Sequence, residues 1–295
     1  MQHVRSLLFV PGDDEDRLAA ARASAADGLV LDLEDTVGPA AKDGARADTV
    51  ETVRRCDDER TRCLVRINGL DTPHGIEDVE AFVDAEVTPD AVLVPDVRDG
   101  TALEIVADAF GTAGLEVPLV GLVERPEAVL AARSIGRSTP RLTALAFGSI
   151  DFQTNMGMPV LDPGTDVYPP RYVVAMAAGA AGIAAYDTVV LDLDDEERLR
   201  EEAVTARTLG YDGKAAVAPE QVEVINEVFT PSEEEVSRAR RLIEAFESAG
   251  EGTGLVEFEG TLVDKPVVDQ QRALLARARA VDGTTDADAG AEGEE

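Results

Sequence analysis

Carboxylates follow several short apolar runs in this 295-residue chain, at positions where metal-assisted chemistry could occur. Glu124 comes directly after the run 119–123, and Asp151 lies four residues after the run 144–147. If both runs are neighbouring parallel strands, their carboxyl ends bring these two side chains together. Magnesium is commonly held by one or two carboxylates, with waters and substrate completing its octahedron. We therefore expect Glu124 and Asp151 to be metal ligands; the alternative is that each caps a helix or pairs with a nearby arginine.

Three further charged residues follow the second and third apolar runs. Glu34 and Asp35 come after the run 29–33, and we expect them to hydrogen-bond the waters of the metal ion, although they could also cap the next helix. Arg66 lies near the end of the run 64–67. It would present a planar cation to a carbonyl or carboxylate oxygen that gains charge during a reaction. A structural ion pair with a nearby carboxylate is the competing interpretation for Arg66.

The scarcity of histidine and cysteine narrows the kind of metal. The chain has two histidines, His3 and His74, which excludes a multi-histidine zinc site and leaves little material for a Ser-His-Asp triad. Cys56 and Cys63 form no Cys-x-x-Cys pair and indicate two reduced, partly buried thiols. Any metal must therefore be held by carboxylates, which favours a hard cation.

Amphipathic segments of helical length separate the apolar runs, so that strands and helices alternate along the chain. Eight such pairs predict a closed (β/α)₈ TIM barrel. An open doubly wound sheet is less well supported, because no Gly-x-Gly-x-x-Gly follows any run. The expected strands are residues 7–10, 29–33, 64–67, 91–94, 119–123, 144–147, 188–191 and 215–218. The expected helices are residues 15–26, 42–54, 75–85, 101–113, 126–135, 170–181, 196–209 and 220–228.

The C-terminal end departs from this alternation. We expect residues 1–230 to form the TIM-barrel catalytic domain, and residues 231–281 to form a helix–hairpin–helix extension that acts as a lid or in oligomerisation. Ser232 and Glu235 form a capping-box pattern that opens a helix. The acidic, glycine- and alanine-rich residues 282–295 are predicted to be disordered.

The charge of the chain is strongly negative. There are 59 acidic and 27 basic residues, which give a formal net charge of −32. Such a field disfavours nucleic acids and anionic membranes, so neither is expected as a partner. It is typical of an acidic surface adapted to high salt, and we expect a halophilic protein from a salt-rich cytoplasm. Equal stability in dilute buffer and in molar KCl would contradict that expectation.

The apolar runs are all short. None approaches the about 18 residues that a membrane span needs. The first residues lead straight into a strand-like run and carry no signal-peptide pattern. The sequence therefore predicts a cytoplasmic protein.

Seven short motifs are spread in order from residue 5 to the last predicted helix. They begin at Arg5 (RSLLFVPG), Leu31 (LDLEDTV), Val65 (VRING), Phe147 (FGSID), Gly210 (GYDGK), Phe229 (FTP) and Gly260 (GTLVDKP). Together they resemble the citrate lyase β-subunit-like group of the HpcH/HpaI aldolase superfamily, which includes malyl-CoA, methylmalyl-CoA and citramalyl-CoA lyases. Each motif alone is weak, but seven in register make the resemblance specific.

The resemblance implies a TIM barrel with Mg²⁺, or Mn²⁺ in its place, that reversibly cleaves a 3-hydroxyacyl-CoA into an acyl-CoA and a 2-oxo acid. Glu124 and Asp151 fall on the family's metal ligands, and Arg66 on an arginine that steadies the enolate or oxo-acid oxygen. Asp264 falls on an acid–base aspartate delivered by a neighbouring subunit, which implies a homotrimer or a hexamer of trimers. The substrate-binding residues implied are Phe9, Arg66, Glu124, Gly148 and Pro219.

Several positions depart from the family pattern where coenzyme A is usually met. Asp14 and Ala20 stand where the family carries an arginine and a lysine, and Asp96 stands where a lysine is usual. Arg125 replaces a small residue, and Ala218 replaces the histidine of the eighth strand. The implied metal ligands are intact, so these departures bear on CoA binding and on the acyl group.

Three functions therefore stay open. The first is a Mg²⁺-dependent lyase that acts on a malyl-CoA-like ester. The second uses the same barrel and metal for CoA-independent aldol cleavage of a hydroxy-oxo acid, or for hydrolysis of a malyl thioester. The third is a non-catalytic paralogue that binds a metabolite or a partner enzyme.

Overall fold

The computed structural model describes residues 3–56, 61–160, 167–249 and 254–281. The chain divides into two compact units, Met1–Phe229 and Thr230–Glu295. The first unit contains the alternating strands and helices. The second contains two helices with a two-stranded β-hairpin between them. Each unit has an apolar core of its own, so the two are described separately.

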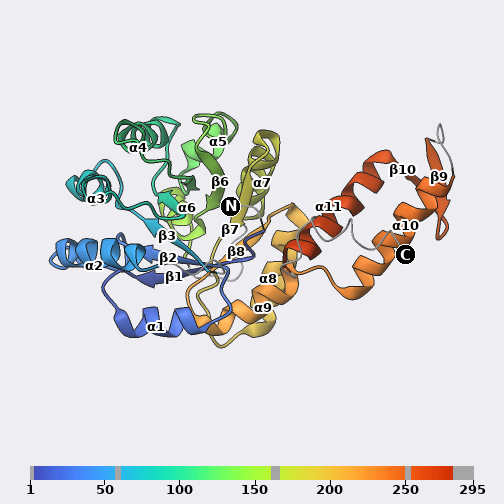
Figure 1. Ribbon diagram of the computed structural model, residues 1–295, viewed down its shortest axis with the longest axis horizontal. Helices are drawn as coiled ribbons and strands as arrows, with labels where there is room; N and C mark the ends of the chain where they lie inside the picture. Colours follow the sequence, from blue (N-terminus) through green and yellow to red (C-terminus); the bar gives the residue numbers. More distant parts are fainter. Residues whose placement is uncertain (1–2, 57–60, 161–166, 250–253, 282–295) are drawn as a thin grey trace, which may run out of the picture. The chain divides into compact units, whose positions relative to one another are not determined.

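Eight parallel strands of the first unit close into a barrel (Figure 1). Each strand pairs with its successor in the sequence, and β8 pairs back onto β1. The predicted (β/α)₈ TIM barrel is therefore confirmed, and the carboxyl ends of all eight strands share one rim. The strands are β1 (Ser6–Pro11), β2 (Gly28–Asp32), β3 (Arg62–Arg66), β4 (Ala91–Val94), β5 (Leu119–Val123), β6 (Leu142–Phe147), β7 (Ala184–Asp187) and β8 (Gly213–Ala216).

Helices surround the barrel and connect its strands (Figure 1). Local signals explain several of their starts: the side chains of Asp14, Thr72 and Asp195 accept hydrogen bonds from the first turns of α1, α3 and α8. The helices are α1 (Glu15–Ala23), α2 (Lys42–Arg54), α3 (Pro73–Asp84), α4 (Thr101–Thr112), α5 (Pro126–Ile135), α6 (Ser149–Met156), α7 (Tyr168–Ala181), α8 (Glu196–Leu209) and α9 (Pro219–Phe229). The predicted bounds are confirmed for β4, β5, α2, α5 and α8.

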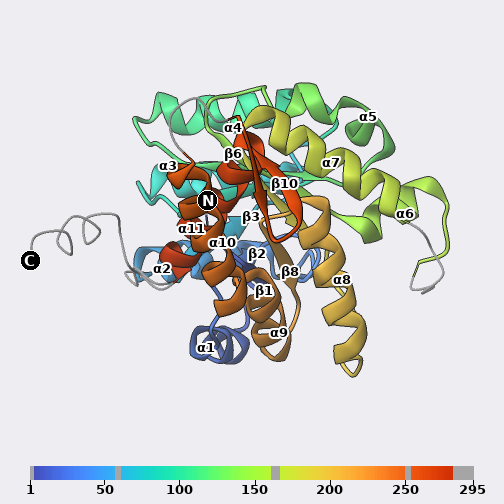
Figure 2. The same ribbon diagram turned by 90° about the vertical axis from the view of Figure 1, so that its right-hand side faces the viewer.

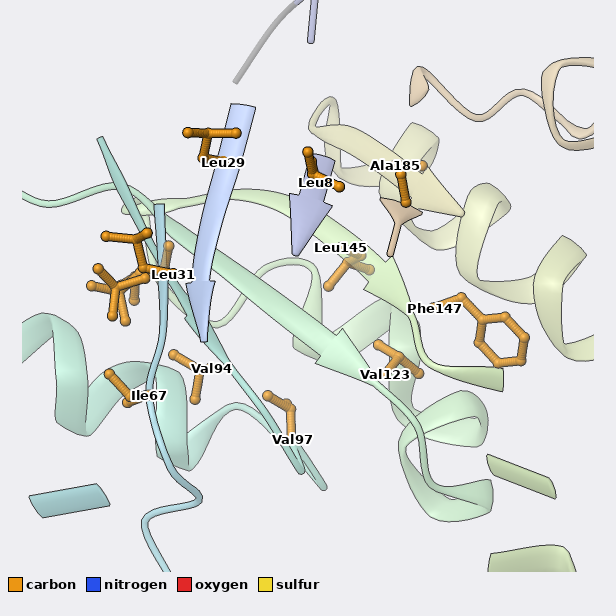
Figure 3. Packing of buried hydrophobic residues seen from close by; sticks show 14 of the residues in the cluster. Leu8, Leu29, Leu31, Ile67, Val94, Val97, Val123, Leu145, Phe147 and Ala185 are labelled. Carbon is orange, nitrogen blue, oxygen red and sulfur yellow. The ribbon is translucent and has the colours of Figure 1, made fainter. Parts of the chain in front are cut away.

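Alternate side chains of the strands form two apolar layers. Leu29 and Leu31 of β2 belong to the larger layer, which packs between the barrel and its helices (Figure 3). Val30, between them, belongs to a second cluster with Leu7 and Tyr186. Full burial of such side chains stabilises the fold by about 1.5–3 kcal/mol each. This packing makes the barrel a rigid frame for the side chains at its rim.

The seventh strand was predicted wrongly. Residues 188–191 were expected, but β7 is Ala184–Asp187, and the predicted segment follows it as irregular chain. Alanine has low β propensity and a charged residue is unusual in a strand, so the β-branched run that follows gave the stronger signal. β8 is likewise Gly213–Ala216 rather than 215–218. The barrel interior accepts these small residues where the sequence pattern favoured larger ones.

Helix α6 was not predicted. Its residues were interpreted as the polar end of the sixth strand, but the chain turns into a helix at Ser149. Its N-cap residue is Gly148, which has no side chain to signal a helix start. Asp151 therefore lies in the first turn of a helix rather than on a loop.

The second unit is the predicted helix–hairpin–helix. The capping box of Ser232 and Glu235 is present at the start of its first helix. Its two strands are antiparallel and turn at Glu259 and Gly260, which both have positive φ (Figure 2). Its elements are α10 (Glu233–Ser248), β9 (Leu255–Phe258), β10 (Thr261–Asp264) and α11 (Lys265–Val281). The tail 282–295, for which disorder was predicted, lies outside the described residues.

Across the described ranges of the chain, no helix combines the length and the apolar character needed to cross a bilayer.

Candidate functional site

Two adjoining cavities open at the carboxyl ends of the barrel strands. The polar cavity, of about 290 Å³, is lined by carboxylates, amides, hydroxyls and the Arg125 side chain, from the segments that follow β2 to β6. The apolar cavity, of about 250 Å³, reaches into the barrel beside Phe9 and Tyr186. Asp35, Glu124 and Asp151 line both cavities. These three carboxylates therefore mark the junction of the polar and apolar cavities.

Glu124 follows β5 and is almost fully buried, with 5% of its surface exposed. Its Oε1 accepts a hydrogen bond of 2.6 Å from the backbone N–H of Asp96, which follows β4. Burial raises the pKa of Glu124 well above its ordinary value, and repulsion from Glu34 and Asp151 adds to the rise. A carboxyl group in these surroundings is stabilised by binding either a proton or a cation.

Asp151 lies at the mouth, in the first turn of α6, and is exposed. Loss of hydration raises the pKa of Asp151, and repulsion from Asp35 adds to this rise. The pKa values of Glu124 and Asp151 are thus shifted in the same direction, first by loss of hydration and then by nearby like charges. This is the condition under which a shared divalent cation would relieve both groups.

The two arginines that could have neutralised this pair have other partners. Arg125 pairs with Asp96, and Arg141 pairs with Glu116 at 3.6 Å. In the described residues neither arginine forms an ion pair with Glu124 or Asp151, although the charge of Arg66 lowers the pKa of both carboxyl groups and that of Arg125 lowers the pKa of Asp151.

The oxygen-rich lining of the polar cavity fits a hard divalent cation. In the described parts of the chain, no group of three or more histidine, cysteine, aspartate or glutamate side chains could hold a metal ion. Magnesium does not need such a group, because it usually keeps several waters and takes only one or two carboxylates from the protein. Glu124 and Asp151, with raised pKa values at the junction of two cavities, meet that requirement.

Gly148 is expected to be essential for the position of Glu124. A Cβ atom at Gly148 would lie 2.8 Å from both Cβ and Oε2 of Glu124, closer than such atoms approach. Gly148→Ala should therefore displace the carboxylate and weaken Mg²⁺ binding by about 10- to 100-fold, as changes beside metal ligands commonly do. Titration calorimetry measures this affinity. Gly179→Ala is the control, since its added Cβ meets no described atom within 4 Å; equal affinities in the two variants would contradict the role of Gly148.

Arg66 lies at the end of β3 with 8% of its surface exposed. Its Nε and Nη2 donate to the two carboxylate oxygens of Asp32 at 2.6 and 2.7 Å, and Nη1 pairs with Glu34 at 2.9 Å and Asp35 at 3.2 Å. The guanidinium also lies over the ring of Phe9, 5.3 Å from its centroid. Arg66 thus forms the structural ion pairs that were the alternative to a catalytic role. Its role toward a substrate stays a prediction.

Two groups that shape this network were not predicted. Asp32 is fully buried and lies directly opposite Arg66 in the register of β2 and β3. Lys42 is buried and its Nζ donates to the carbonyl oxygens of Leu33 and Glu34 at 2.7 and 2.6 Å, and to Asn68 Oδ1 at 2.6 Å. The register could have indicated Asp32, but the partners of Lys42 are mainly backbone atoms, which leave no pattern in the sequence.

Glu34 and Asp35 lie on the loop after β2 and line the polar cavity. Neither caps the next helix, which begins at Lys42 with Ala41 as its N-cap residue. Burial raises the pKa of Glu34 to about 8, although Arg66 opposes the rise. Both carboxylates are in the polar cavity where waters of a cation would lie, but that role is untested.

Mg²⁺ is expected to stabilise the protein more at about pH 9 than at about pH 6. The pKa of Glu34 is raised from 4.5 to about 8. Protonation of Glu34 therefore contributes fully to the stability of the fold below pH 4.5, and this contribution is lost as the pH rises through 8. Above about pH 8, Glu34 is already ionised, so a bound cation displaces no proton from it. The gain in melting temperature on adding Mg²⁺ should therefore grow with pH. Glu34→Gln should weaken this dependence, and the raised pKa of Glu124 would account for what is left. A gain that is independent of pH in the parent protein would contradict this linkage.

The remaining predicted residues lie in different places. Phe9 and Gly148 line the apolar cavity. Pro219 begins α9, and within the described chain neither cavity's lining includes it, whereas Val217 lines the apolar cavity. Asp264 ends β10 in the second unit, is exposed, and its Oδ1 accepts a hydrogen bond of 3.4 Å from the backbone N–H of Val267. Its contact within this chain is thus that of a helix-capping residue.

Comparisons with other proteins find similarity over most of the chain. A model of the HpcH/HpaI aldolase/citrate lyase family matches residues 5–219. Citrate lyase subunit beta from Leuconostoc mesenteroides subsp. cremoris is 34% identical over 284 residues, which are 94% of this chain and 93% of that protein. A (3S)-malyl-CoA thioesterase from Cereibacter sphaeroides is 36% identical over 278 residues, which are 94% of this chain and 95% of that protein.

Solved structures show the same similarity. The protein CitE from Mycobacterium tuberculosis, in complex with magnesium, acetoacetate and coenzyme A, matches with a TM-score of 0.79 at 32% identity, over 93% of this chain and 98% of that chain. A citrate lyase beta subunit from M. tuberculosis, complexed with oxaloacetate and magnesium, matches with a TM-score of 0.68 at 30% identity, over 77% of this chain and 97% of that chain. The similarity thus extends over most of the chain.

Proposed function

Because the chain belongs to the HpcH/HpaI aldolase/citrate lyase family, we propose that it is a Mg²⁺-dependent lyase that reversibly cleaves a 3-hydroxyacyl-CoA into an acyl-CoA and a 2-oxo acid. The family is one of carbon–carbon lyases. Malyl-CoA, methylmalyl-CoA and citramalyl-CoA are the proposed substrates. All three carry the hydroxyl group whose deprotonation starts this kind of cleavage.

One observation carries the proposal. Glu124 and Asp151 line both cavities of the rim, and both have raised pKa values. A site of this kind binds a cation at the boundary between a polar and an apolar chamber. The similar M. tuberculosis proteins were solved in complex with magnesium, which supports a magnesium-dependent reaction.

Glu124 and Asp151 would hold the ion, and Glu34 and Asp35 would bind its waters. When bound, a divalent cation polarises the carbonyl oxygen of the oxo acid and offsets the negative charge that develops there. The paired carboxylates would also fix the direction in which the substrate's oxygens approach. Mn²⁺ is expected to replace Mg²⁺, because both accept carboxylate and water ligands.

The protein's own groups would carry the proton. As the carbon–carbon bond breaks, a base takes the hydroxyl proton and the electron pair of the bond moves to the α-carbon of the thioester, which is then protonated. We assign the base to Asp264 of a neighbouring subunit, in a homotrimer or a hexamer of trimers. Arg66 would donate a hydrogen bond to the oxygen that gains charge. Phe9 and Gly148, which line the apolar cavity, would bind the substrate beside it.

A product assay tests this function. Protein with Mg²⁺ and each of the three esters is expected to release glyoxylate or pyruvate together with the acyl-CoA, and a chelator should abolish both products. The oxo acid is measured as its phenylhydrazone, and the acyl-CoA by chromatography. Absence of oxo acid from all three esters in high salt would contradict the proposal.

Hydrolysis of a malyl thioester is the second candidate, favoured by the 36% identity to a (3S)-malyl-CoA thioesterase. It would release malate and free CoA in place of an oxo acid, and a thiol reagent detects the CoA. CoA-independent aldol cleavage is favoured by Asp14, Ala20 and Asp96, which are less suited to phosphate groups than the basic residues usual there. The same product assay with a CoA-free hydroxy-oxo acid distinguishes it.

A further inference from the structure

A buried ion pair joins the seventh and eighth strands beside the rim. Lys214 of β8 is fully buried and lies opposite Asp187 of β7 in the strand register. Its Nζ donates to Asp187 Oδ2 at 2.5 Å. Burial lowers the pKa of Lys214, and the Asp187 carboxylate opposes this shift. A charged lysine in such a place needs a structural reason, because burial of an ammonium group is costly without partners.

The pair is embedded in a larger cluster whose charges balance. Arg171 of α7 donates from Nε and Nη2 to both oxygens of Asp187, at 3.0 and 2.9 Å. Its Nη1 donates to Glu202 of α8 at 2.7 Å. Arg171 alone would therefore supply a hydrogen bond to each oxygen of Asp187. Asp187 thus does not need a hydrogen bond from Lys214. The second hydrogen bond that Lys214 Nζ donates gives a reason for a lysine here.

That second hydrogen bond leads toward the metal-binding carboxylates. Lys214 Nζ donates to the backbone carbonyl of Thr188 at 2.7 Å. The hydroxyl of Thr188 accepts a hydrogen bond of 3.1 Å from the backbone N–H of Ser149, and the two hydroxyls are 2.7 Å apart. Ser149 is the first residue of α6, and Gly148 at the N-cap position has no side chain to serve as a cap. Thr188, in the irregular segment that follows β7, therefore caps α6.

We propose that Lys214 is a positioning residue for the metal site, acting through Thr188 on the first turn of α6, which carries Asp151. Lys214 fixes the backbone of residue 188, the hydroxyl of Thr188 fixes the start of α6, and the helix start sets where the Asp151 carboxylate lies. Lys214 itself lies too deep to touch a substrate, since its whole side chain is buried. The inference rests on the proposed function, because it assumes that Asp151 binds the cation.

Mn²⁺ affinity, measured by electron paramagnetic resonance without substrate, tests the inference. Thr188→Val keeps the shape and the carbonyl but removes the capping hydroxyl, and it should raise the Kd for Mn²⁺ by about tenfold. Thr188→Ser restores the hydroxyl and should return the Kd to the parent value. Lys214→Met leaves Asp187 paired with Arg171, and it should raise the Kd to a similar extent. Glu202→Gln alters the outer end of the cluster, and it should lower the melting temperature without changing the Kd.

The outcomes distinguish failure of the proposed function from failure of the positioning role of Lys214 and Thr188. If the parent protein binds no Mn²⁺, the proposed function fails and this inference fails with it. If the parent binds Mn²⁺ and Thr188→Val binds it within twofold of the parent, the inference alone is overturned, whatever its melting temperature. A lower melting temperature with an unchanged Kd is the result that a purely structural role would produce. A raised Kd that Thr188→Ser restores supports positioning through the hydroxyl.

Discussion

Glu124→Gln is expected to lower kcat/KM for ester cleavage by about a thousandfold, since loss of the polarising cation removes several kcal/mol of transition-state stabilisation. Gln keeps the size of the side chain and can still accept the hydrogen bond that the Asp96 N–H donates to Oε1. What it loses is the negative charge that binds the cation. The substitution also removes a carboxyl group whose pKa is raised by burial, so the apo protein should be no less stable than the parent.

Activity and Mg²⁺ affinity should therefore fall together in Glu124→Gln while the melting temperature of the apo protein is maintained. Asp71→Asn is the matched control, because Asp71 also lines the polar cavity but is 61% exposed and pairs with Arg98. This control should change kcat/KM by less than about threefold, because screening weakens an exposed ion pair. A Glu124→Gln enzyme with parental kcat/KM would remove Glu124 from the reaction. Equal losses in the two variants would indicate a general effect of cavity charge.

Arg66→Met is expected to lower the free energy of unfolding by about 3–5 kcal/mol, as breaking a buried ion pair usually does. Burial alone would raise the pKa of Asp32, but the hydrogen bonds and charge of Arg66 hold it below its ordinary value. Without Arg66, the fully buried Asp32 carboxylate would have no ion-pair partner among the residues that the structure describes. Urea unfolding at neutral pH measures the effect.

Arg17→Met is the control for this prediction. Arg17 pairs with Asp14 at 3.3 Å, but both side chains are exposed, so the loss should be less than about 1 kcal/mol. Arg66→Lys keeps the positive charge but loses the bidentate hydrogen bonding to Asp32. The stability of this variant should therefore lie between those of the parent and Arg66→Met. If Arg66→Met unfolds at the same urea concentration as Arg17→Met, the network around Asp32 contributes little to the fold.

Much of the barrel could be predicted because its strands are bounded by helices with clear periodicity. β4 and β5 consist mainly of valine and leucine, and their bounds were predicted correctly. β7 was misplaced because Ala184 and Ala185 carry little signal of their own and become strand residues only by pairing with β6 and β8. Where tertiary pairing decides the element, local pattern is an insufficient guide.

Some residues of the candidate site could likewise be predicted from the sequence, and others could not. Glu124 was found because it follows a well-marked strand, and Asp151 was found although the helix that carries it was not. α6 could not be predicted because its cap is Thr188, which lies far away in the sequence. The three carboxylates around Arg66 could be anticipated only as alternatives, since a guanidinium at a strand end suits either a substrate or an ion pair.

Anomalous diffraction from crystals grown with Mn²⁺ tests most directly whether the rim of this barrel binds a catalytic cation. A single anomalous peak is expected within about 2.3 Å of a carboxylate oxygen of Glu124 and one of Asp151, with waters in the remaining positions. The peak should vanish in Glu124→Gln. A peak bound elsewhere, or a clear map of the parent protein in which neither side chain contacts Mn²⁺, would contradict the account.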